Sequence, residues 1–132
     1  MQTILITGAT GFVGSHALTT LADQTDIHLI AACRTPDKLP AGFSGEIRTG
    51  DLRDPAYRSS LLEGVDVLIH AAAWTSLWGH AALSQQLYRE PSLALIEQAR
   101  RSGVRRFINI STTSAAAPER SADAMSQGIE RP

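Results

Sequence analysis

Three glycines near the start of the sequence are spaced so that the backbone around them could hold a phosphate group. Gly8, Gly11 and Gly14 lie between an apolar, β-branched run at 3–7 and an apolar-periodic segment that begins at Phe12. A turn of this kind brings the free N–H groups of a helix N-terminus against a pyrophosphate, and the last glycine lets helix and strand pack closely. Glycines also occur as simple turn formers, but the strand before and the helix after favour a dinucleotide site.

The spacing of this loop separates it from other phosphate-binding sequences. It differs from the G-x-G-x-x-G form, and it lacks the Gly-Lys-[Ser/Thr] that a nucleoside-triphosphate loop requires, which disfavours an NTPase. We therefore predict that a dinucleotide cofactor binds to the loop residues Gly8, Thr10, Gly11, Phe12, Val13 and Gly14.

The end of the second apolar run bears on the choice of cofactor. An NAD site normally has an Asp or Glu there, which holds the ribose 2′-hydroxyl. This sequence has Cys33, Arg34 and Thr35 instead, so no carboxylate repels a 2′-phosphate. The Arg34 guanidinium can bind that phosphate or stack on adenine, although Arg34 also fits a solvated loop residue. We predict NADP in preference to NAD.

Two acidic residues follow the third apolar run, and their neighbours suggest different roles. Asp51 lies just past the run at 46–49, which places it at the sheet edge where open α/β folds bind ligands. Asp54 precedes Pro55 and better suits a helix N-cap. We therefore expect Asp51 to face a ligand and Asp54 to begin a helix.

Strands and helices alternate along the sequence, which would bring these residues to one edge of a parallel sheet. Five short apolar runs are expected to be strands, at 3–7, 27–33, 46–49, 65–70 and 106–111. Helices are expected from Phe12, at about 55–62 and from about 77 to 102, the last with an apolar stripe of Leu87, Leu93, Leu95, Ile96 and Ala99. Pro91 predicts a kink or the first turn of a second helix. The alternation indicates a parallel sheet with right-handed crossovers.

Composition limits the class of protein. A chain of 132 residues with 43% apolar residues is expected to form one globular domain. Its net charge of -1 does not favour nucleic acid or an acidic membrane as a partner. Cys33 is the only cysteine, the histidines have no zinc-site spacing, and no apolar run approaches the ~18 residues of a membrane span. Without a basic, signal-like start, the expected setting is the cytoplasm.

The ordered set of motifs resembles the short-chain dehydrogenases/reductases, and more closely their extended, NAD(P)-dependent epimerase/dehydratase branch. Thr7 to Gly14 is similar to the family's T-G-x-x-G-x-x-G signature. The further matches, in the same order, are Gly50 to Asp54, His70 to Ala73, Gly103 to Phe107 and Ser111 to Ser114. The resemblance covers residues 3 to about 118. It implies an open, doubly wound parallel sheet (Rossmann) in the strand order 3-2-1-4-5.

The resemblance also implies roles for individual residues. Asp51 would bond the adenine amino group, and the backbone N–H of Leu52 would reach a ring nitrogen. The small side chains of Ala71, Ala72 and Ala73 would allow the backbone to approach the cofactor ribose. Thr112 would orient the substrate hydroxyl or carbonyl, and Trp74 and Trp78 could form a substrate wall or cover the core edge.

The sequence departs from the family where proton transfer is concerned. The family's Tyr-x-x-x-Lys pair occurs nowhere in the chain, and Tyr88 to Ser92 stands where Asn-Val-x-Gly-Thr is usual. We expect residues 1–118 to form an incomplete NAD(P)-binding domain, truncated before the catalytic pair and the substrate domain, with 119–132 as a polar, mobile tail. The chain alone is then expected to be inert, and uncovered apolar surface favours a homodimer.

Two functions follow from the resemblance and these departures. The parent protein would be an oxidoreductase or epimerase that acts on a nucleotide sugar or a similar alcohol or carbonyl substrate. The alternative is a non-catalytic NAD(P)-binding module with a regulatory or sensing role. Binding of NADP or NAD is common to both.

Overall fold

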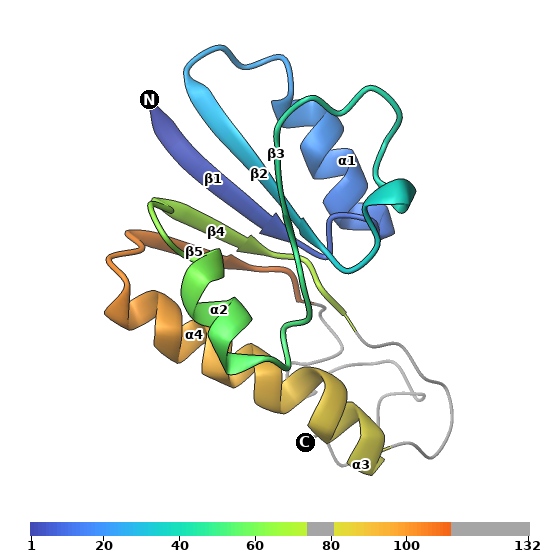
Figure 1. Ribbon diagram of the computed structural model, residues 1–132, viewed down its shortest axis with the longest axis vertical. Coiled ribbons are helices and arrows are strands. Elements are labelled where there is room, and N and C mark those ends of the chain that lie inside the picture. The colour runs from blue at the N-terminus through green and yellow to red at the C-terminus, as the bar shows by residue number, and fades with distance from the viewer. Residues whose placement is uncertain (74–80, 112–132) are drawn as a thin grey trace, which may run out of the picture.

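The computed structural model describes residues 1–73 and 81–111, and five parallel strands form its sheet. The strands are β1 (Gln2–Thr7), β2 (Ile27–Cys33), β3 (Glu46–Thr49), β4 (Val67–His70) and β5 (Arg106–Asn109). Their order across the sheet is β3-β2-β1-β4-β5, and every neighbouring pair is parallel (Figure 1). The predicted fold class and strand order are confirmed.

Helices cover the two faces of the sheet, as the doubly wound prediction requires. Helix α1 (Phe12–Leu21) lies on one face, and α2 (Pro55–Leu61) and α4 (Glu90–Arg101) lie together on the other (Figure 1). Three shorter elements are the 3-10 helix η1 (Pro36–Lys38), α3 (Ala81–Ser84) and the π-helical turn η2 (Gln85–Arg89). Because all neighbouring strands are parallel, the carboxyl ends of the five strands share one edge of the sheet.

The central strand β1 is buried on both faces, because its alternate side chains enter two separate cores. Leu5 belongs to the core under α2 and α4, together with Leu68 and Leu95. Ile4 and Ile6 belong to the core under α1. This two-sided burial is the reason why β1 consists almost entirely of β-branched and apolar residues.

The helical prediction at 77–102 is right in type over 81–101 but wrong in two details, and its start at 77–80 lies outside the described residues. Pro91 lies in the first turn of α4, as one of the two alternatives predicted, and η2 precedes it in place of a regular α-helical turn. Leu95 and Ala99 are buried as expected, but Leu93 and Ile96 are 50% and 42% exposed. The buried stripe of α4 is therefore narrower than its apolar sequence suggests, because only one side of the helix meets the sheet.

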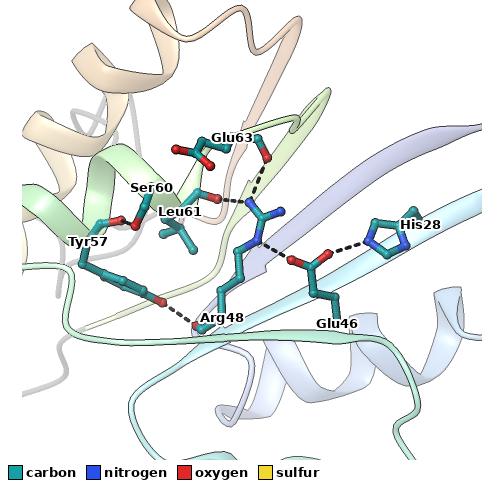
Figure 2. A network of polar contacts seen from close by, with 7 residues as sticks. All are labelled: His28, Glu46, Arg48, Tyr57, Ser60, Leu61 and Glu63. Carbon is teal, nitrogen blue, oxygen red and sulfur yellow. Dashed lines mark hydrogen bonds and ion pairs between the residues drawn. The ribbon is translucent and has the colours of Figure 1, made fainter.

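Strand β3 is tied to α2 by one arginine, Arg48 (Figure 2). Arg48 Nη1 donates to the carbonyl oxygens of Leu61 and Glu63 at 2.6 and 2.9 Å, and its Nε donates to Glu46 at 2.7 Å. Glu46 also contacts His28 Nε2 at 2.7 Å. The guanidinium thus supplies a donor to the last carbonyl of α2, Leu61 O, and to Glu63 O just beyond the helix. This network fixes the end of α2 against β3.

Candidate functional site

A cleft of about 630 Å³ opens at the carboxyl edge of the sheet. Its walls come from the glycine loop, the ends of β2 and β3, the segment after β4, and the turn η2 with the start of α4. The predicted cofactor-binding residues that line it are Gly8, Thr10, Gly11, Phe12, Val13, Arg34, Asp51, Leu52, Ala71, Ala72 and Ala73. Gly14 is the one member of that predicted set that does not line the cleft. Residues far apart in the sequence therefore share one cavity.

Two of the glycines are required by close backbone packing. Gly8 has a φ of 65°, and a Cβ there would lie 2.5 Å from the backbone nitrogen of Ala72. A Cβ on Gly14 would overlap the carbonyl oxygen of Gly8, so the first turn of α1 rests directly on the end of β1. Gly14 thus contributes through packing, as the last glycine of such a loop is expected to do.

The N-terminus of α1 faces the cleft with its backbone amides. Gly11 is the N-cap and has no side chain with which to accept from the first-turn N–H groups. Its own N–H donates to the carbonyl of Gly8 at 3.0 Å, which closes the turn. Uncapped amides and the positive end of the helix dipole make this position suited to an anion.

The loop after β3 is held rigidly beside the end of β2. The Gly50 N–H donates to Cys33 O at 3.1 Å, and the Tyr57 ring packs so closely on Gly50 that no side chain would fit there. Tyr57 donates its hydroxyl proton to Arg48 O at 2.6 Å (Figure 2), and burial raises its pKa to about 12. Tyr57 therefore acts as a neutral structural group under this wall of the cleft.

Two predictions for the acidic residues of this loop have different outcomes. Asp54 caps α2 and accepts from Ala56 N at 3.0 Å, as predicted. Asp51 lines the cleft, but in this structure its carboxylate is paired with Arg53 at 2.7 Å. Hydrogen bonds from the Arg53 side chain lower the pKa of Asp51 to about 2. Arg53 was not singled out by the sequence, although an arginine two residues after an aspartate in a turn is a usable signal.

A buried polar network lies under the floor of the cleft. His70 is 1% exposed; its Nδ1 lies 2.6 Å from Thr7 Oγ1 and its Nε2 lies 2.9 Å from Ser92 Oγ. The rings of His70 and Tyr88 are stacked with centroids 6.2 Å apart. Burial lowers the pKa of His70 to about 4, so the imidazole is neutral at pH 7. His70 thereby links the end of β1 to α4, the element that carries one wall of the cleft.

Several predicted residues lie outside the described part of the chain. Thr112, Trp74 and Trp78 belong to the ranges 74–80 and 112–132, as does the predicted tail at 119–132. Within residues 1–73 and 81–111, no group of three or more His, Cys, Asp or Glu side chains could hold a metal ion. In the same ranges, no helix has the length and apolar character needed to cross a membrane.

The strand order, the helix-terminal amides and the cleft at the carboxyl edge define an NAD(P)-binding Rossmann domain. Residues 4–130 match the family model described as "NAD dependent epimerase/dehydratase family". The chain belongs to this family.

Named relatives agree with that assignment. A 3 beta-hydroxysteroid dehydrogenase/Delta 5-->4-isomerase of Mycobacterium tuberculosis (strain CDC 1551 / Oshkosh) is 34% identical over 120 residues, which cover 84% of this chain and 32% of that protein. A UDP-glucose 4-epimerase of Vibrio cholerae is 34% identical over 116 residues, which cover 84% of this chain and 35% of that protein. This chain spans about a third of the length of these curated relatives.

Solved structures give the same result for the fold. A short-chain dehydrogenase/reductase superfamily protein from Agrobacterium tumefaciens, with bound NAD, superposes with a TM-score of 0.74 at 27% identity. That match covers 86% of this chain and 34% of the other. A UDP-glucose 4-epimerase superposes with a TM-score of 0.73 at 27% identity and covers 89% and 37% of the two chains.

Proposed function

We propose that this chain binds NADP in preference to NAD, with the cofactor pyrophosphate on the loop from Gly8 to Gly14. The observation that carries the proposal is the packing of this loop, because bare backbone at Gly8 and Gly14 brings the α1 amides to the cleft. A pyrophosphate there would meet uncapped N–H groups and the positive end of a helix. The contribution of Thr10, Phe12 and Val13 is to line this part of the cleft.

The adenosine end of the cofactor belongs at the ends of β2 and β3. Asp51 would accept from the adenine amino group, and the Leu52 N–H would donate to a ring nitrogen. Arg34 lines the cleft directly after β2, and the end of β2 itself carries no Asp or Glu that would repel a 2′-phosphate. A guanidinium recognises a phosphate through paired, charge-assisted hydrogen bonds, which supports the preference for NADP.

The opposite end of the cofactor belongs beside the segment after β4. Ala71, Ala72 and Ala73 line the cleft there, and their small side chains let the cofactor ribose approach the backbone. When bound, the nicotinamide would accept or donate hydride. Thr112 is proposed to orient the substrate hydroxyl or carbonyl next to it.

For the whole protein we propose an oxidoreductase or epimerase activity on an alcohol or carbonyl substrate, such as a nucleotide sugar. The names of the relatives, a hydroxysteroid dehydrogenase and a UDP-glucose epimerase, are consistent with that broad class. The sequence contains no Tyr-x-x-x-Lys pair, and the proton-transfer step of the family depends on one. We therefore propose that this chain binds cofactor without turning over substrate by itself.

Titration calorimetry of the purified chain with NADPH and with NADH tests this proposal. We expect NADPH to bind and to bind more tightly than NADH, with no oxidation of NADPH when sugar-nucleotide or ketone substrates are added. Absence of binding by folded protein would overturn the cofactor assignment. Sustained turnover would overturn the assignment of an inert chain. A gain of a specific protein partner on cofactor binding would favour the sensing role.

A further inference from the structure

The carboxylate expected to hold adenine already accepts from three N–H groups of Arg53 in this structure. Asp51 Oδ1 accepts from the backbone N of Arg53 at 2.9 Å and from its Nε at 3.1 Å. Asp51 Oδ2 accepts from the same Nε at 3.1 Å and from Nη2 at 2.7 Å. A carboxylate has about four lone-pair sites, two on each oxygen. A further donor, such as an adenine amino group, therefore competes with the Arg53 side chain for Asp51.

The backbone contact is fixed by the turn, so the side chain of Arg53 is the contact that can leave. Arg53 is 51% exposed at its side chain, so its guanidinium has free space around it. The other charged groups of this loop are committed to the backbone. Asp54 accepts from Ala56 N at 3.0 Å, and Arg58 donates to Leu52 O at 2.6 Å.

A second guanidinium lies close to the same carboxylate. Arg34 and Asp51 both line this cleft, and the positive charge of Arg34 adds to the effects that lower the pKa of Asp51. The Gly50 N–H to Cys33 O hydrogen bond holds the two loops together. Among the described residues, the charged side chains that line this cleft are thus two arginines, Arg34 and Arg53, and one carboxylate, Asp51, which favours an anionic ligand.

We propose that Arg53 is a second determinant of NADP selectivity and acts by exchanging its anionic partner. When adenine occupies Asp51, the Arg53 guanidinium turns to the 2′-phosphate, which it shares with Arg34. NADP thereby replaces the ion pair that adenine disrupts, whereas NAD leaves Arg53 without an anion. The inference rests on the proposed function and adds to it the residue that links adenine binding to phosphate recognition.

Two nucleotides that differ only by the 2′-phosphate isolate this effect. Adenosine 2′,5′-bisphosphate and adenosine 5′-phosphate are titrated into the full chain and into Arg53→Met, with affinity measured by calorimetry. We expect Arg53→Met to weaken the bisphosphate roughly tenfold to hundredfold, the range of one lost charge-assisted contact. Binding of the 5′-phosphate is expected to be unchanged or tighter, because Asp51 no longer has to release its partner.

Controls separate this role from a general loss of charge. Arg100→Met removes a comparable exposed arginine that is paired with Glu97 on α4 at 2.8 Å, and it should leave both affinities unchanged. Arg53→Lys retains the charge without the paired donors, and it should give an intermediate loss for the bisphosphate only.

Two further results would count against the inference in different ways. Equal changes for both nucleotides in Arg53→Met, or no change for either, would overturn the exchange at Asp51 while the proposed function stands. Failure of both nucleotides and of NADPH to bind the folded wild-type chain would overturn the proposed function itself. Circular dichroism of each variant confirms that the exposed substitution leaves the fold intact.

Discussion

Replacing His70 with Phe tests whether the imidazole under the cleft is a structural link. The substitution keeps an aromatic ring between Tyr88 and Phe107 but removes both hydrogen-bonding nitrogens. Thr7 is fully buried, so its hydroxyl would lose its hydrogen-bond partner without gaining water. The hydroxyl of Ser92 would lose its hydrogen bond to the other ring nitrogen. Unpaired buried polar groups cost roughly 1–3 kcal/mol each. We expect the free energy of unfolding at pH 7 to fall by about 2–4 kcal/mol.

The same residue predicts a specific dependence on pH. Burial lowers the pKa of His70 from 6.5 to about 4, so between these values the unfolded chain binds more protons than the folded one. Stability from this group is therefore complete above pH 6.5 and is lost as pH falls toward 4. A shift of this size corresponds to about 3 kcal/mol. Below both pKa values no further loss occurs.

Urea denaturation at a series of pH values, followed by circular dichroism, measures both effects. Subtracting the free energy of unfolding of His70→Phe from that of the wild type at each pH removes the pH dependence that comes from carboxylates common to both. His70→Gln retains polarity without titrating, and Ser92→Ala removes one hydrogen bond but keeps the imidazole. We expect the pH-dependent loss to disappear in the two His70 variants and to persist in Ser92→Ala. An unchanged slope in His70→Phe would refute the reasoning.

The remaining predictions concern the loop, the α2 connections and the sheet edge. Gly14→Ala forces the first turn of α1 away from Gly8. Calorimetry should then show NADPH bound at least tenfold more weakly, which corresponds to a loss of about 1.4 kcal/mol in binding free energy. Arg48→Met leaves two carbonyls without their donor, and urea melts should show a loss of about 1–3 kcal/mol. Asp54→Ala removes the cap of α2, and the same melts should show the free energy of unfolding lowered by about 1 kcal/mol. Ile108, 39% exposed on β5, is expected to support self-association, so Ile108→Ser should lower the dimer fraction in sedimentation velocity.

The sheet and the glycine loop could be predicted because their signals are local. A buried parallel strand appears in the sequence as a continuous apolar run, and alternation of strands with helices predicts a parallel sheet. The strand order was implied by the family resemblance. The glycines at positions 8 and 14 are required by backbone contacts that the loop makes with its immediate surroundings. The apolar strand runs and the glycine spacing each lie within about a dozen residues of sequence, a window in which periodicity is informative.

The polar contacts at the cleft could not be predicted because the fold creates them. His70 is 63 residues from Thr7 and 22 from Ser92, and only the packing of β1, β4 and α4 brings them together. Leu93 and Ile96 have apolar sequence positions but face away from the sheet, since nothing local distinguishes an inner from an outer side of α4. The pairing of Asp51 with Arg53 is short-range, but adenine recognition alone gave no reason to look for a competing arginine.

The central claim is that the loop from Gly8 to Gly14 holds the pyrophosphate of a nicotinamide cofactor on backbone amides. Titration of the isotope-labelled chain with NADPH, followed by amide chemical shifts, tests it most directly. The account predicts saturable shifts largest at the amides of Gly11, Phe12 and Val13, with further shifts at Asp51 and Ala72. Saturable binding whose largest shifts lie on another surface, with this loop unaffected, would contradict it.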